Sequence, residues 1–267
     1  MAARFLVDLR IKIVYNIGEK RGEYMTGIYE MAEKKIKIIS LHKKVHDYCR
    51  DYRSYGEPDF TVETTQSDID YERVRSARTD ALEGLPQRVS SDSYLEELAV
   101  YRKIAEKMPD YDTFLFHGSA VAVDGQCYLF TAKSGTGKST HTRLWRELLG
   151  DKAVMVNDDK PLIRADENGV VVFGTPYNGK HRLGTNISVP LKAVCILERS
   201  PENNIRQITR NEAYTMLLQQ SYRPHDSTAM AKTLVLIDRM AESVKFWRLG
   251  CNMYISAAQT SYSAMKG

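Results

Sequence analysis

The feature that most constrains this chain is a glycine-rich segment, Ala132 to Thr140 (AKSGTGKST). It matches G-x-x-x-x-G-K-[ST] at every position except the first, where Ala132 replaces glycine, and it lies between strand-like and helix-like sequence. Gly135 and Gly137 permit a tight loop whose backbone N–H groups point at phosphate oxygens. The segment therefore predicts a phosphate-binding loop rather than a Gly-Ser-Thr surface turn.

The residues at the end of this loop indicate which side chains would contact a bound nucleotide. Lys138 brings a positive charge to the β- and γ-phosphates, and the Ser139 hydroxyl is a hard oxygen ligand suited to Mg²⁺. The start of the following helix adds about half a positive charge. We expect ATP and Mg²⁺ to be bound here, by Ser134, Gly135, Thr136, Gly137, Lys138, Ser139 and Thr140.

Two adjacent aspartates, Asp158 and Asp159, follow the apolar run Ala153 to Asn157. Neighbouring carboxylates repel each other and neither suits a core, so the pair favours a functional edge over a polar turn between strands. One carboxylate can hold Mg²⁺ while the other accepts a proton from a nucleophile. In an extended chain the two side chains project in different directions, which allows this division of roles.

His117 and a basic loop are further candidates for the same site. His117 lies near the end of an apolar stretch (FLFHG), although a lone histidine there is more often structural. The loop at 174–186 (GTPYNGKHRLGTN) carries three potential cations among glycines, and cations can close over a transferring phosphate. Within it we expect Lys180 to act in catalysis because it follows a glycine; the alternative is a solvated loop.

The pattern from residue 113 onward predicts a mixed α/β core. Asp124-Gly125 and the segment 166–169 are turn signals of β-hairpins, which argue against a purely parallel sheet. The expected strands are 113–123, 126–131, 153–157, 161–165, 170–173, 192–197 and 245–249, and the expected helices run from the loop to about 149, over 211–221 and 228–243, and at the C-terminal end.

The N-terminal part predicts a smaller α/β region. Alternating residues at 35–41 (KIKIISL) predict a strand, 43–52 a helix and 59–64 a second strand, as in a βαβ unit. The stretch 66–92 is polar and gives no clear element, 93–107 has helical spacing, and 1–24 is treated as optional. We divide the chain into an N-terminal region, 1–95, and a core, 96–267, with acceptor recognition as a role for the former.

Composition excludes several classes of protein. The 38 Lys and Arg against 34 Asp and Glu give a charge of only +4, too small an excess to argue nucleic-acid binding. We find no apolar run long enough for a membrane span and no signal-peptide pattern, so a cytoplasmic protein is the expectation. The four cysteines form no CxxC pair, so a zinc or thioredoxin-like site is not supported.

Taken in order, these motifs resemble the kinase domain of the HPr kinase/phosphorylase family, within the phosphoenolpyruvate carboxykinase-like P-loop superfamily. The shared features are His117-Gly118, the hairpin at 124–125, the loop Ser134 to Ser139, the pair Asp158-Asp159 and the return strand at 187–197. The resemblance covers about 113–200 well and 200–267 loosely. It implies a mixed-sheet P-loop core of that type.

The resemblance also implies roles for individual residues. His117 and Asp158 would assist deprotonation of an acceptor hydroxyl, while Ser139 and Asp159 would bind Mg²⁺. We expect His117 to lie close enough to tune Asp158 or to hold the acceptor. Because residues 1–95 and the stretch 176–183 (PYNGKHRL) differ from the HPr enzymes, the chain looks more like the divergent relatives that phosphorylate other hydroxyls.

The sequence thus predicts an ATP- and Mg²⁺-dependent kinase acting on a serine-like hydroxyl of a peptide, protein or small molecule. The alternatives are a nucleotide-binding regulatory protein without phosphotransfer and a small carboxykinase-like enzyme. The sequence leaves the acceptor and the oligomeric state open, although kinases of this family often form oligomers.

Overall fold

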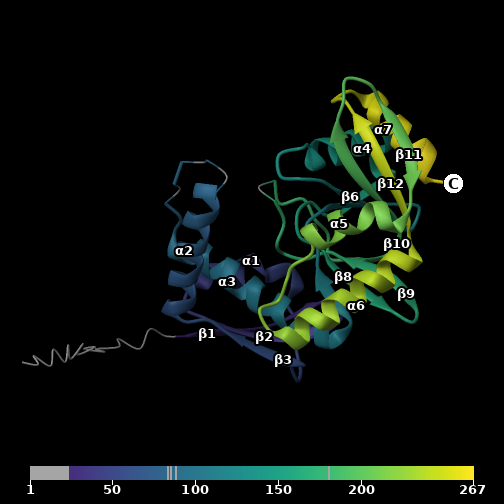
Figure 1. Cartoon of the computed structure of the whole chain (residues 1–267). Coiled ribbons are helices and arrows are strands. Elements are labelled where there is room, and N and C mark those ends of the chain that lie inside the picture. The colour runs from purple at the N-terminus through teal and green to yellow at the C-terminus, as the bar shows by residue number, and fades with distance from the viewer. Residues whose placement is uncertain (1–23, 83, 85, 88, 180) are drawn as a thin grey trace, which may run out of the picture.

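Two β-sheets, one small and one large, organise the residues that this computed structural model describes, 24–267 without 83, 85, 88 and 180 (Figure 1). The small sheet has the order β1-β2-β3, with β1 antiparallel and β3 parallel to β2. Its strands are β1 (Met25–Met31), β2 (Lys34–Ser40) and β3 (Phe60–Glu63). The parallel pairing of β2 and β3 around a helix confirms the predicted βαβ unit.

Three helices accompany the small sheet: α1 (Lys43–Tyr48), α2 (Gln66–Leu82) and α3 (Asp92–Lys107). The helix predicted over 43–52 ends early and continues as a 3₁₀ turn, Arg50–Tyr52. The boundary drawn at residue 95 falls inside α3. Buried residues of α3 pack in one cluster with the small sheet and with Leu115, Leu162 and Phe173 of the large one, so the two sheets share a core.

The large sheet is mixed, with the order β4-β8-β9-β10-β6-β5-β7 and with β12 pairing β10 and β11. Its hairpins follow the predicted turns: Asp124 and Gly125 have φ of +51° and +74° between β5 and β6. The strands are β4 (Thr113–Leu115), β5 (Ser119–Val123), β6 (Gln126–Thr131), β7 (Ala153–Asn157), β8 (Leu162–Asp166), β9 (Gly169–Phe173), β10 (Ser188–Arg199), β11 (Asn204–Ile208) and β12 (Lys245–Cys251).

The single strand predicted over 113–123 is wrong, because the chain breaks into β4 and β5, which pair with different neighbours. Between them, the N–H of Phe116 donates to Pro161 O, that of His117 to Gln220 O and that of Gly118 to Asp159 O. A side chain at Gly118 would meet Leu129 and the backbone of Phe130 at 2.9 and 3.1 Å, so glycine permits this close crossing.

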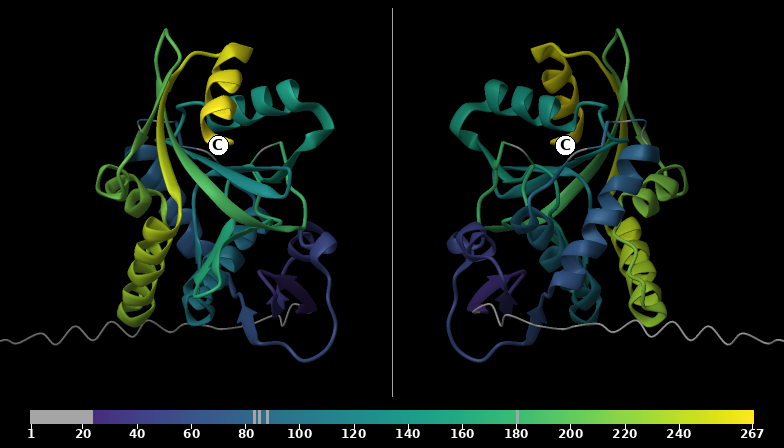
Figure 2. Two further views of the ribbon diagram at one scale, coloured as in Figure 1. Left: turned by 90° about the vertical axis from the view of Figure 1, so that its right-hand side faces the viewer. Right: turned by 90° about the vertical axis from the view of Figure 1, so that its left-hand side faces the viewer.

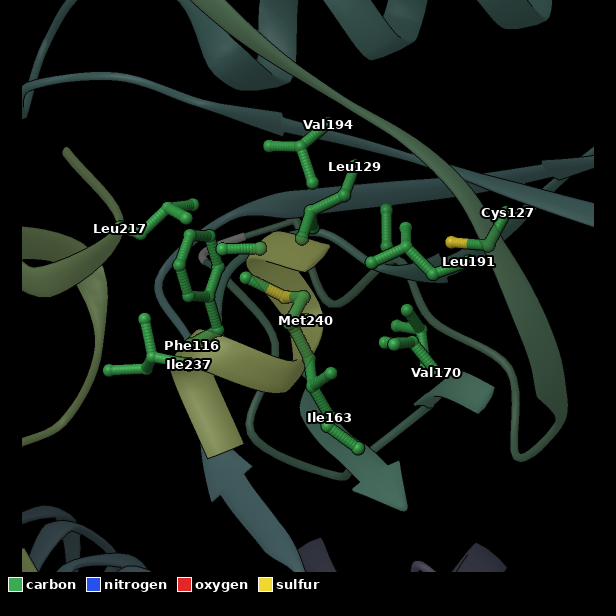
Figure 3. Close-up of a cluster of buried hydrophobic side chains, with 14 of the residues drawn as sticks. Phe116, Cys127, Leu129, Ile163, Val170, Leu191, Val194, Leu217, Ile237 and Met240 are labelled. Carbon is green, nitrogen blue, oxygen red and sulfur yellow. The ribbon is translucent and has the colours of Figure 1, made fainter. Parts of the chain in front are cut away.

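Helices cover both faces of the large sheet (Figure 2). On one face lie α5 (Arg210–Gln220) and α6 (Ser227–Ser243), whose Leu217, Ile237 and Met240 belong to the cluster around Phe116 and Leu129 (Figure 3). On the other face, α4 (Lys138–Leu149) and α7 (Ile255–Met265) pack through Trp145 and Ala258. Burial on both faces explains why these strands read as continuous apolar runs.

The strand directions bring several loops to one edge of this sheet. β10 is parallel to β6 and to β12, while β5 is antiparallel to both β6 and β7. The carboxyl ends of β12, β10, β6 and β7 therefore lie at the same edge, together with the start of β5. Ligands of open α/β sheets bind at such an edge. None of the helices described is long and apolar enough to cross a membrane.

Candidate functional site

The glycine-rich loop connects the end of β6 to the start of α4, as the sequence predicts. Gly135 and Gly137 have φ of +74° and +123°, conformations that L side chains rarely adopt. A Cβ atom at Gly135 would meet nothing within 4 Å, so open space lies beside this backbone. The loop is also tied to β10, because Arg199 Nη2 donates to Gly135 O at 2.5 Å.

Lys138 is buried at the first position of α4, and its Nζ donates to Ala132 O at 3.3 Å. Burial lowers the pKa of Lys138, and the negative charge of Asp159 opposes that shift. The next side chain, Ser139, is exposed in the first helical turn. A desolvated cation, a free helix start and an exposed hydroxyl form a donor set that fits a bound phosphate chain.

The aspartate pair follows β7 and is held by Asn157, a fully buried residue. Asn157 Oδ1 accepts the N–H groups of Asp159 and Lys160 at 2.9 and 2.7 Å, and its Nδ2 donates to Thr175 Oγ1 at 2.9 Å. Sequence reasoning gave Asn157 no role. The sequence feature that could have pointed to Asn157 is an amide residue at the end of an otherwise apolar strand.

Asp158 is buried at 4% exposure and lies under the loop that begins at Gly174. Its Oδ1 accepts the N–H of Gly179 at 2.5 Å, whereas its Oδ2 has no hydrogen-bond partner among the described residues. Burial raises the pKa of Asp158 and the charge of Asp159 adds to this, against the Gly179 N–H and His181. One carboxylate oxygen is thus buried without a partner among the described residues, and the carboxylate is made more basic.

Asp159 has different neighbours. Its Oδ1 lies 3.2 Å from His117 Nε2 and its Oδ2 lies 3.6 Å from Lys160 Nζ. Burial raises the pKa of Asp159, but the His117 hydrogen bond and the charges of Lys160, His117 and Lys138 outweigh it, so the pKa is lowered. The expected pairing of His117 with Asp158 is corrected: His117 contacts Asp159, because the break after β4 places it beside that residue.

The basic loop is buried over 174–177 and exposed at 181, 182 and 184–186 on its described residues. Tyr177 is buried and stacks on Tyr101, with ring centroids 3.7 Å apart, and Tyr101 donates to Lys160 O at 2.6 Å. Arg182, at a φ of +49°, places its guanidinium 4.9 Å from the ring centre of Tyr48. Lys180, the residue assigned to catalysis from sequence, lies outside the described residues.

The predicted metal ligands, Ser139 and Asp159, supply two hard oxygen groups. Among the residues that the structure describes, no group of three or more His, Cys, Asp or Glu side chains could hold a metal ion by itself. Mg²⁺ in nucleotide sites is usually held by one or two carboxylates together with substrate phosphates. The donor set therefore fits an ion that arrives with a nucleotide.

Fold and site together define a mixed α/β protein whose sheet edge joins a glycine-rich loop to a pair of aspartates, of which Asp158 is buried. The chain belongs to the family described as SynChlorMet cassette protein ScmC, whose model matches residues 90–241, more than half of the chain. A comparison with curated proteins finds no match.

Among solved structures, the HPr(Ser) kinase/phosphatase from Coxiella burnetii matches 57% of this chain and 99% of its own, with 11% sequence identity and a TM-score of 0.31. At that score the likeness is too loose to support a conclusion about this chain.

Proposed function

We propose that this protein is a kinase that uses ATP and Mg²⁺ to phosphorylate a hydroxyl group of a peptide, protein or small molecule. The observation that supports this most directly is the unequal environment of the two aspartates beside the loop of Lys138. Asp158 has an oxygen without a hydrogen-bond partner among the described residues and a raised pKa, whereas, despite burial, the His117 hydrogen bond and the charges of Lys160 and Lys138 lower the pKa of Asp159. A buried carboxylate whose Oδ2 meets no partner in the described part of the chain suits a base that receives a proton better than a group that only helps to hold a nucleotide.

In this proposal Asp158 is the general base. The acceptor hydroxyl gives its proton to Asp158 Oδ2 while its oxygen bonds to the γ-phosphorus, and the bond from that phosphorus to the β–γ bridging oxygen breaks, leaving ADP. Because Gly179 covers Asp158, the loop at 174–186 must shift to admit the acceptor and can then exclude water.

Lys138 and Asp159 act on the nucleotide side. Lys138 and the loop N–H groups would balance the charge of the β- and γ-phosphates. Ser139 and Asp159 would hold Mg²⁺, which when bound neutralises charge on the phosphate oxygens. His117 fixes the carboxylate of Asp159 in place through the 3.2 Å contact and is thereby a positioning residue.

The acceptor would approach from the N-terminal region. A cavity of about 730 Å³ lies between α2, α3 and the large sheet, and its walls include Tyr101, Tyr222 and Lys160. Lys160 also lies beside Asp159, so this cavity begins next to the proposed transfer site. Its position supports acceptor recognition as a role for this region.

The test separates the two aspartates. Asp158→Asn keeps the shape and the Gly179 contact but removes the base, so turnover should fall about 10²- to 10⁴-fold while affinity for ATP·Mg²⁺ is nearly unchanged. Asp159→Asn should instead weaken Mg²⁺-dependent nucleotide binding and recover part of its activity at high Mg²⁺.

Calorimetry with and without Mg²⁺, followed by turnover across a Mg²⁺ titration, measures both effects. Rescue of the Asp158 variant by Mg²⁺ would exchange the two roles. Unchanged turnover in both variants would reject the kinase and leave a nucleotide-binding regulator.

A further inference from the structure

A second cavity lies directly against the glycine-rich loop, on the side away from the aspartates. Its volume is about 690 Å³, and Gly135, Gly137 and Thr140 form one wall. The opposite wall comes from the ends of β10 and β12, at 199–201 and 251–254. Because β6 pairs with β10 and β10 with β12, this cavity continues the same sheet edge in the order cavity, loop, aspartates.

The wall formed by 199–201 and 251–254 is held together by hydrogen bonds of two asparagines, Asn203 and Asn252. Asn252 Nδ2 donates to Pro201 O at 3.1 Å, and the N–H of Asn252 donates to Asn203 Oδ1 at 3.0 Å. Asn203 Nδ2 in turn donates to Ser256 Oγ at 3.0 Å. The segments after β10 and β12 thus hold each other in place along this wall.

The lining is suited to a flat, uncharged ring. Leu144 and Leu197 are buried apolar residues of the lining. His141 is also buried, and burial lowers its pKa to about 4, so its ring is neutral at pH 7. Met253 and Tyr254 are 76% and 73% exposed, and neither is held in a core. An exposed tyrosine beside an apolar wall is a stacking platform for a nucleobase.

From these observations we infer that the cavity binds the base of the nucleotide whose phosphates lie on the glycine-rich loop, with Tyr254 stacking on that base. The inference rests on the proposed function and deepens it by assigning the nucleoside subsite. The residues from 245 onward that form this wall lie outside the segment that the family model matches. Arg199 joins the two subsites, since it lines the cavity and holds Gly135 O.

The test compares ATP with inorganic triphosphate, which has the phosphates but no base. Calorimetry in Mg²⁺ should show that wild type binds ATP more tightly than triphosphate. Tyr254→Ala should lower ATP affinity by about tenfold and leave triphosphate affinity unchanged, because base stacking is lost and phosphate contacts are kept. Tyr254→Phe should retain ATP affinity. Tyr55→Ala removes a tyrosine of 78% exposure that does not line this cavity and should change neither ligand.

The outcomes distinguish the two proposals. If wild type binds neither ligand, the proposed function fails and the base site is overturned with it. If wild type binds triphosphate as tightly as ATP, or if Tyr254→Ala keeps the full preference for ATP, the base site alone is overturned and the phosphate loop stands.

Discussion

At the scale of single residues, two neighbouring aspartates acquire opposite properties from their surroundings. The sequence could predict that they project differently, because adjacent side chains of an extended segment do so. It could not predict that Gly179 would cover Asp158 or that His117 would reach Asp159, since both contacts depend on loops distant in the chain. Asn157, which fixes the pair, is different: it accepts hydrogen bonds from Asp159 and Lys160 within three residues, so its role could have been recognised from the sequence but was missed.

The raised pKa of Asp158 leads to a prediction about pH. Because the folded state holds this proton above the ordinary value of 3.8, ionisation of Asp158 lowers the stability of the fold: its contribution is favourable below 3.8 and is lost as the pH rises through the folded pKa. Turnover needs the ionised form, so the acid limb of the pH–rate profile should lie above pH 3.8.

Asp158→Asn should accordingly melt at an equal or higher temperature at pH 7 while losing turnover. Thermal melts of both proteins at pH 7, with turnover recorded from pH 4 to 8, check this. A melting temperature clearly below wild type would mark Asp158 as a structural residue rather than a base.

At the scale of elements, strands and helices with strong apolar periodicity were predicted, whereas those held by their neighbours were missed. The helix α2 is mostly polar, with Ile69 as its fully buried apolar residue, and it is fixed to α3 by Arg102 with Glu72 and Lys103 with Asp68. No periodic signal could reveal such a helix. The strand break at Gly118 was missed because it depends on hydrogen bonds to segments that come later in the chain.

The prediction at the scale of elements concerns how the loop at 174–186 is held in place. Tyr177 anchors it by stacking on Tyr101, so Tyr177→Ala should lower the free energy of unfolding by about 3 kcal/mol and free the loop. Amides of the loop should then exchange faster and turnover should fall, whereas Tyr177→Phe keeps the ring and should behave nearly as wild type. Hydrogen exchange with a denaturant titration measures both. Loop protection equal to wild type in Tyr177→Ala would show that the stack does not hold the loop.

At the scale of the whole molecule, one sheet edge carries the proposed base cavity, the glycine-rich loop and the aspartates in that order, and the cavity lined by α2 and α3 reaches Lys160 beside them. The sequence predicted the mixed sheet and the strand before the loop. The side-by-side placement of the ends of β6, β10 and β12 could not be predicted, because strand order is set by pairing between distant segments. Because the two sheets share a core, α3 packs against both of them, and the boundary predicted at residue 95 falls inside this helix.

The measurement that tests the kinase most directly is transfer of label from γ-labelled ATP in an extract separated into protein, peptide and small-molecule pools. With Mg²⁺, wild type should label an acceptor in one pool. Lys138→Ala should label none because it loses the nucleotide. Asp158→Asn should label at least about 100-fold more slowly although it binds ATP·Mg²⁺ as wild type does. Equal labelling by wild type and Asp158→Asn, or no label in any pool from a wild type that binds ATP, would contradict the proposed phosphotransfer.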